Sequence, residues 1–112
     1  MTPLARPPLF RIDQHECADG TTQLALIGEL DLAFADELAR KLGKLSAAHH
    51  RVALSLAQLT FIDSSGIRVL VNAAIDARRD GWDLEISQEL APQIRRVIDL
   101  TGLTTYLWPE AN

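Results

Sequence analysis

The sequence is poor in residues that several large protein classes need. Cys17 is the single cysteine, so an internal disulfide and a zinc site of several cysteines are excluded, and this usage suits a reducing cytoplasm. Aromatic residues make up 5% of the chain and the formal net charge is -4. Both features disfavour nucleic acid as a direct partner, because phosphate backbones and single strands are bound by basic and aromatic surfaces. We therefore expect a cytoplasmic protein that does not contact nucleic acid.

Long hydrophobic runs are missing too. The longest, Ile67 to Ile75, is interrupted by Arg68 and Asn72 and falls well short of the roughly 20 apolar residues that span a bilayer. The first ten residues contain three prolines and lack the apolar stretch of a signal peptide. We expect no membrane insertion and a flexible N-terminal arm over residues 1–8.

What is present is an ordinary globular composition. Of the 112 residues, 47% are hydrophobic and 23% are charged, which predicts one compact domain over residues 9–112. Five segments have the apolar patterns of strands, the first two joined by a turn at Asp19 and Gly20. These segments are 9–16, 22–29, 51–56, 82–87 and 104–108. The second strand is expected to be central with both faces covered, because residues 24–27 are all apolar. Small Ala53 and Ser55 indicate a helix packed close to the third strand.

Three further segments, 31–45, 64–80 and 92–100, have the three- and four-residue spacing of amphipathic helices. Asp31 is the expected N-cap of the first, and Gly81 and Gly102 are the expected stops of the other two. The apolar stripes include Ile75 and Val97. On the first helix, Asp36 with Arg40 and Glu37 with Lys41 have the spacing of exposed ion pairs. The predicted fold is α/β, a small mixed sheet of about five strands with three main helices, in the order β-β-α-β-α-β-α-β.

Chemistry is most plausible at the turn from Phe61 to Gly66, which joins a strand to a helix start. Asp63 and Ser64 are both good caps, and capping alone is the simpler interpretation of this pattern. The functional interpretation is that the Ser64 hydroxyl is exposed and backed by unpaired N–H groups suited to an anion. Gly66 would then leave room for another molecule to approach.

A family resemblance favours the functional interpretation. Residues 28–33 (GELDLA), 59–67 (LTFIDSSGI) and 91–103 (APQIRRVIDLTGL) resemble, in the same order, three stretches of the STAS domain of anti-sigma factor antagonists. The similarity runs from Leu9 to Trp108. Each stretch alone is weakly specific, but the three together at these spacings are fairly specific.

The resemblance implies a function and a set of site residues. Ser64 matches the serine that is phosphorylated by an anti-sigma factor serine kinase and reset by a phosphatase. The implied partner-binding residues around it are Asp63, Ser65, Gly66, Ile67 and Arg68. Unmodified protein would bind the kinase and phosphorylated protein would release it, so that sigma-factor-dependent transcription, including stress responses, is regulated. An alternative within the same family is an accessory subunit of an ABC-type lipid transporter or a scaffold of a stress-sensing complex.

Other chemistry has little support in the sequence. His15, His49 and His50 lack a further ligand at a useful spacing, so we expect no metal and no cofactor. The serine turn is not the G-x-S-x-G pattern of a hydrolase, and Cys17 has neither a second cysteine nor a basic neighbour to activate it. We therefore expect a switch that binds partners and is not an enzyme.

Overall fold

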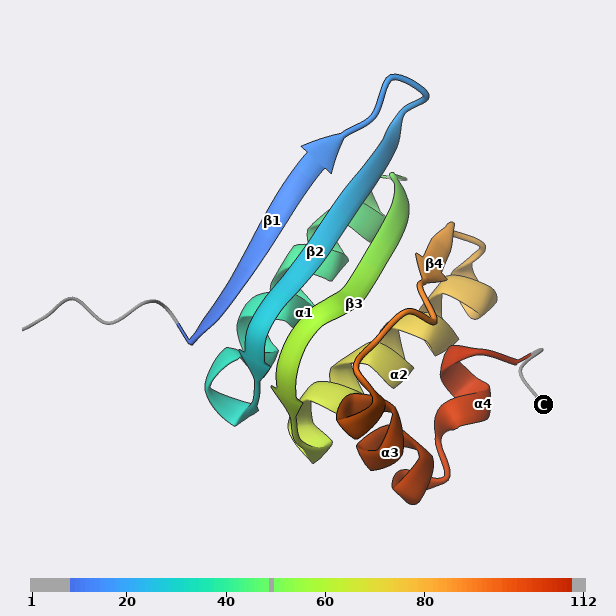
Figure 1. Ribbon diagram of the computed structural model, residues 1–112. Helices are drawn as coiled ribbons and strands as arrows, with labels where there is room; N and C mark the ends of the chain where they lie inside the picture. Colours follow the sequence, from blue (N-terminus) through green and yellow to red (C-terminus); the bar gives the residue numbers. More distant parts are fainter. Residues whose placement is uncertain (1–8, 49, 110–112) are drawn as a thin grey trace, which may run out of the picture.

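The computed structural model describes residues 9–48 and 50–109, so the expected arm over residues 1–8 lies outside the described residues. One four-stranded sheet contains β1 (Phe10–Glu16), β2 (Thr21–Leu30), β3 (Arg51–Ile62) and β4 (Leu84–Ile86), in the order β1-β2-β3-β4. β1 is antiparallel to β2, whereas β3 is parallel to both β2 and β4 (Figure 1). The second strand is therefore central, as expected.

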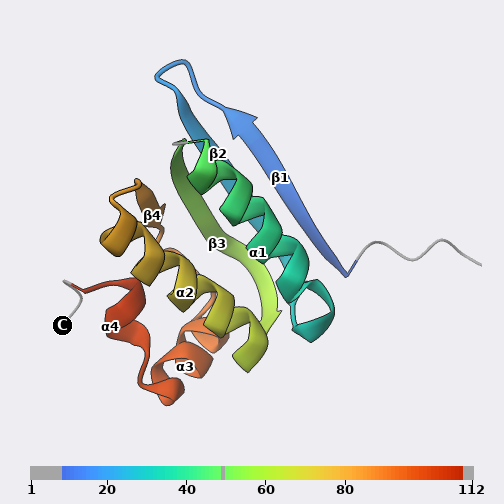
Figure 2. The ribbon, with the colours of Figure 1, turned by 180° about the vertical axis from the view of Figure 1, so that it is seen from behind.

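Four helices accompany the sheet. They are α1 (Leu32–Ala47), α2 (Ser64–Asp80), α3 (Pro92–Thr101) and the short α4 (Thr104–Leu107). α1 and α2 lie side by side on one face of the sheet, and α3 and α4 follow on the β4 side (Figure 2). In the described residues no helix is long and apolar enough to cross a membrane. The fold class is the expected mixed α/β arrangement.

The core lies between the sheet and these helices. Leu24, Leu54 and Leu70 are among its fully buried side chains. The capping predictions are confirmed: Asp31 caps α1, and Gly81 and Gly102 end α2 and α3 in the left-handed conformation with φ of 72° and 74°. Local signals therefore predicted the helix boundaries well, because a cap acts within a few residues of the helix end.

The expected fifth strand at residues 104–108 is wrong, because Thr104–Leu107 forms α4. Buried Leu107 and Trp108 pack into the core beside α2. The Arg78 guanidinium donates a hydrogen bond to the backbone carbonyl of Tyr106. A run of five residues cannot separate a strand from a short helix by periodicity, and here tertiary packing decides. The third strand is also longer than expected and continues to Ile62.

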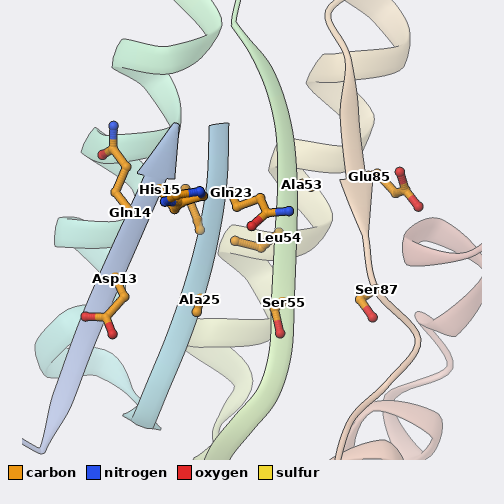
Figure 3. Close-up of a pocket in the computed structure, with 11 residues that line it drawn as sticks. Asp13, Gln14, His15, Gln23, Ala25, Ala53, Leu54, Ser55, Glu85 and Ser87 are labelled. Atoms are coloured by element: carbon orange, nitrogen blue, oxygen red, sulfur yellow. The ribbon is translucent and has the colours of Figure 1, made fainter. Parts of the chain in front are cut away.

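The expectation of two covered sheet faces is also wrong. The face opposite α1 and α2 is open, and small Ala25, Ala53 and Ser55 leave a hollow of about 360 Å³ on it (Figure 3). The small side chains of β3 thus line open space instead of a close-packed helix. His15 and Glu85 belong to the residues that line this hollow.

Two apolar side chains and two expected ion pairs on the surface differ from expectation. Ile75 and Val97 were expected to point inward, but each is 37% exposed. The spacing of Asp36 with Arg40, and of Glu37 with Lys41, predicts ion pairs, yet neither pair forms among the described residues. Long exposed side chains gain little from such pairs, so spacing alone does not bring the charges together.

Candidate functional site

The candidate site lies where the starts of α1 and α2 meet. β2 and β3 are parallel neighbours and end at the same edge of the sheet, with Leu30 opposite Ile62. Each strand is followed by a helix that is capped by an aspartate, Asp31 for α1 and Asp63 for α2. The backbone N–H of Asp63 donates to the carbonyl of Leu30 over 3.2 Å. The two caps are therefore held side by side.

Asp63 is the N-cap of α2, and its carboxylate is fully engaged. Oδ1 accepts hydrogen bonds from the N–H groups of Ser65 (2.9 Å) and Gly66 (3.1 Å). Oδ2 accepts from the N–H of Leu32 over 3.2 Å, across to the first turn of α1. One side chain thus satisfies donors at two helix starts, where backbone N–H groups otherwise lack partners.

This geometry corrects the expectation that Ser64 is backed by free donors for an anion. The N–H groups of Ser65 and Gly66 already donate to Asp63, and the N–H of Ile67 donates to the Asp63 carbonyl over 3.0 Å. A phosphate on Ser64 would therefore lie next to a carboxylate, and these three donors are not free to bind it.

Gly66 makes room for the chain's own core. A Cβ atom at this position would lie 2.7 Å from both the Cγ and the carbonyl oxygen of Leu30. Gly66 is buried, and Ile67 is 1% exposed. These two residues can therefore shape and anchor the turn, but a partner docked on the surface cannot contact their side chains directly.

Three of the named residues present side chains to solvent. Ser64 is exposed at the first position of α2, Ser65 is half-buried, and Arg68 is exposed one turn further along. Within the described residues, the Ser64 hydroxyl takes part in no hydrogen bond and Arg68 in no ion pair. Both groups are available to a partner.

Two exposed apolar residues that sequence reasoning missed are close to the Asp63 cap, Leu32 through a hydrogen bond and Phe61 along the chain. Leu32 is 74% exposed, and its N–H is bound to Asp63. Phe61 is 46% exposed at the end of β3, two residues before Asp63. Isolated exposed apolar residues are ordinary, but these two flank a polar turn. One signal existed in the sequence: Leu32 directly follows the expected cap Asp31.

No cluster of three or more His, Cys, Asp or Glu residues in the part of the chain described by the structure could hold a metal ion. His50 instead takes part in a structural contact, with its Nδ1 atom 3.1 Å from the Thr22 hydroxyl. That hydroxyl donates its hydrogen to Glu16 over 2.8 Å. The Thr22 oxygen can therefore only accept from His50, which requires the tautomer with a hydrogen on Nδ1.

Comparisons with known proteins point in one direction. The family model described as "MlaB, STAS domain" matches residues 14–109. BtrV of Bordetella bronchiseptica, assigned as an anti-sigma factor antagonist, is 32% identical over 95 residues, which cover 84% of this chain and 80% of BtrV. The anti-sigma-B factor antagonist of Bacillus subtilis is 28% identical over 81 residues, 72% of this chain and 73% of that protein.

Solved structures agree on the fold. An anti-sigma factor antagonist from Mycobacterium paratuberculosis superposes with a TM-score of 0.73 at 23% identity, covering 91% of this chain and 86% of that one. The phosphorylated form of the Bacillus cell fate determinant SpoIIAA superposes with a TM-score of 0.65 at 18% identity, covering 86% and 87%. The curated relatives are regulatory proteins, which agrees with the expectation that this chain is not an enzyme. The chain belongs to the STAS domain family and, within it, to the anti-sigma factor antagonists.

Proposed function

We propose that this protein binds an anti-sigma factor that is a serine kinase, and that phosphorylation of Ser64 by this kinase ends the complex. The observation that carries the proposal is the exposed, unbonded Ser64 hydroxyl at the start of α2, directly after the Asp63 cap that also binds the N–H of exposed Leu32. Exposed Leu32 and Phe61 give a partner apolar area to bury near this turn. Asp63, Ser65 and Arg68 complete the contact surface, and Gly66 and Ile67 hold its shape.

The transfer itself needs only a nucleophile from this chain. The Ser64 oxygen forms a bond to the γ-phosphorus of ATP, the bond from that phosphorus to ADP breaks, and the hydroxyl proton passes to a base on the kinase. Nothing in this chain has to supply catalysis. A phosphatase would later hydrolyse the ester and restore the hydroxyl.

The charge of the product explains release. A phosphoserine adds about -1.5 to -2 charge at neutral pH, directly beside the Asp63 carboxylate. Because Asp63 already holds the Ser65 and Gly66 donors, these N–H groups do not compensate the new charge. Burying it against a partner beside Leu32 and Phe61 would carry a desolvation penalty. Arg68 lies four residues after Ser64 on α2, so its guanidinium is placed to pair with the phosphate. That pairing would make the Arg68 side chain unavailable to the partner.

A pull-down from lysate of the native host, read by mass spectrometry, tests the proposal. The baits are the wild type, Ser64→Ala and Ser64→Asp, with Ser46→Ala, near the far end of α1, as the matched control. We expect a serine-kinase-like protein to bind Ser64→Ala and Ser46→Ala, and to bind Ser64→Asp about tenfold more weakly or worse. Phosphate should be found on Ser64 of the wild type.

Equal recovery of the kinase by the alanine and aspartate variants would rule out the switch. Recovery of an ABC-type ATPase by all four baits would instead support the transporter-subunit alternative, in which Ser64 has no regulatory role. Thermal unfolding of each bait is the control for folding. Ser64 is not the cap of α2, so both of its variants should unfold within about 0.5 kcal/mol of the wild type.

A further inference from the structure

The outer edge of β1 is unpaired in the described part of the molecule. β1 ends the strand order, and β2 is its one neighbour (Figure 1). The Leu9 carbonyl accepts from the N–H of Glu29, and the N–H of Cys17 donates to Thr21. Given the register of the two strands, odd-numbered residues bond to β2. The N–H and carbonyl groups of the even-numbered residues Phe10, Ile12 and Gln14 therefore point outward.

Beside this edge, α1 presents a stripe of charge. Glu37, Arg40, Lys41 and Lys44 recur at spacings of three and four residues and line one groove with Phe10 and Ile12 of β1. The groove has a volume of about 450 Å³. Figure 2 shows α1 running along β1 on the helix side of the sheet. We call Arg40, Lys41 and Lys44 the basic stripe.

The basic stripe is not neutralised by the chain itself. None of its three residues forms an ion pair with a carboxylate in the residues that the structure describes. The whole chain, in contrast, has a formal net charge of -4. The side chains of α1 that line the groove are three cations and one carboxylate, Glu37, so the groove has a local charge opposite in sign to that of the whole molecule.

We propose that the outer edge of β1 binds an extended acidic segment of a partner protein as an added strand. Its backbone would pair with the outward groups of Phe10, Ile12 and Gln14, at the usual spacing of about 4.8 Å. Every second side chain of the added strand would then lie on the helix side, next to the basic stripe. The matching segment therefore has acidic residues at alternate positions.

A second copy of this chain fits the edge less well. If β1 paired with β1 of a second copy, the side chains brought to the helix side would be those of Phe10, Ile12 and Gln14, which are uncharged. The pairing would also place a second basic stripe opposite the first. Like charges facing each other oppose association. The proposal is also independent of Ser64, which follows the carboxyl end of β3 and does not line this groove.

The test is calorimetric titration of the full chain at low ionic strength with a blocked peptide of alternating Glu and Val, about eight residues long. The same peptide with Lys in place of Glu is the peptide control. We expect the Glu peptide to bind, the Lys peptide not to bind, and Arg40→Glu to weaken binding about fivefold or more. Arg96→Glu, the same charge reversal on exposed α3, should leave the affinity unchanged.

Gln14→Pro separates strand addition from charge attraction alone. Proline removes the outward N–H of residue 14 and leaves the bonds to β2 intact, so binding should weaken relative to Gln14→Ala. Three results would overturn the proposal: no binding of the Glu peptide, equal losses for Arg40→Glu and Arg96→Glu, or equal affinities of Gln14→Pro and Gln14→Ala. A dimer in sedimentation that Gln14→Pro dissociates would also overturn it, because a second copy would then occupy the edge.

Discussion

Asp63 shows how one side chain links local and tertiary structure. Its bonds to Ser65 and Gly66 are those of any N-cap, and the Asp-Ser-Ser-Gly sequence predicted them. Its bond to the N–H of Leu32 joins residues 31 positions apart. That contact exists because β2 and β3 end at the same sheet edge, so no local pattern could predict it.

We predict that Asp63→Ala lowers the free energy of unfolding by about 1–2 kcal/mol, because two helix starts lose an acceptor. Asp63→Asn should cost less, since an amide oxygen still caps α2 while the amide nitrogen cannot accept from Leu32. Urea unfolding with an unchanged m-value measures both. Identical losses for the two variants would show that the Oδ1 cap does not contribute.

Gly66 and Gly43 give a matched pair of glycine substitutions inside helices. Gly66→Ala should destabilise by about 1–3 kcal/mol, because the added Cβ meets Leu30 at 2.7 Å. Gly43→Ala should stabilise by up to about 1 kcal/mol, since nothing lies within 4 Å of a Cβ there. Thermal unfolding of both proteins checks this. A shift of the same sign for both would mean that contact with Leu30 does not restrict position 66.

At the scale of elements, the β1–β2 hairpin is closed by a polar cluster at one end. Hydrogen bonds from Gln14 (2.7 Å) and Thr22 (2.8 Å), with the nearby His50 and His15, lower the pKa of Glu16 below its ordinary value of 4.5. Thr22 is fully buried, although Glu16 is exposed. The carboxylate therefore satisfies a hydroxyl in the core.

A lowered pKa gives this cluster a defined dependence on pH. The unfolded chain binds the Glu16 proton more readily than the folded one, so the stabilisation is complete above pH 4.5 and is lost as the pH falls through the lowered pKa. We expect the melting temperature of Glu16→Gln to lie below that of the wild type at neutral pH. The difference between the two melting temperatures should shrink as the pH falls below 4.5. A difference that does not change with pH would assign the effect to packing.

For the whole molecule, the residues after α3 are held against β4, the edge strand opposite β1, by contacts of Trp108. The Trp108 indole N–H donates to the carbonyl of Ile86 over 2.8 Å, and the Arg95 guanidinium lies 4.9 Å from the ring centroid. Trp108 is 5% exposed. These contacts connect β4 and α3 with Trp108, directly after α4, and they replace the strand pairing expected from the sequence.

We predict that Trp108→Phe costs about 1 kcal/mol through the lost hydrogen bond and the unpaired Ile86 carbonyl. Trp108→Ala should cost about 3–5 kcal/mol, as other buried large-to-small changes do. Denaturant unfolding followed by circular dichroism measures both. If Trp108→Phe unfolds like the wild type, the hydrogen bond adds nothing and the ring alone fastens the segment.

Local sequence patterns predicted α1, α2, α3, the four strands and the turn around Ser64, but not α4. Caps, helical spacing and strand alternation act within a few residues, which is why Asp31, Asp63, Gly81 and Gly102 marked helix ends correctly. The exposed position of Ser64 also follows from its place at a helix start. These properties need no knowledge of the rest of the chain.

Which faces and edges are covered depends on the packing of the whole fold. The open sheet face, the packing of Gly66 against Leu30, the exposed Leu32 beside Asp63 and the basic stripe beside β1 all join residues far apart in the chain. Residues 104–107 form α4 for the same reason, since packing against α2 and the hydrogen bond from Trp108 to Ile86 take the place of strand pairing. Hydrophobic burial is non-directional, so local patterns show what must be covered, and the packed fold determines what covers it.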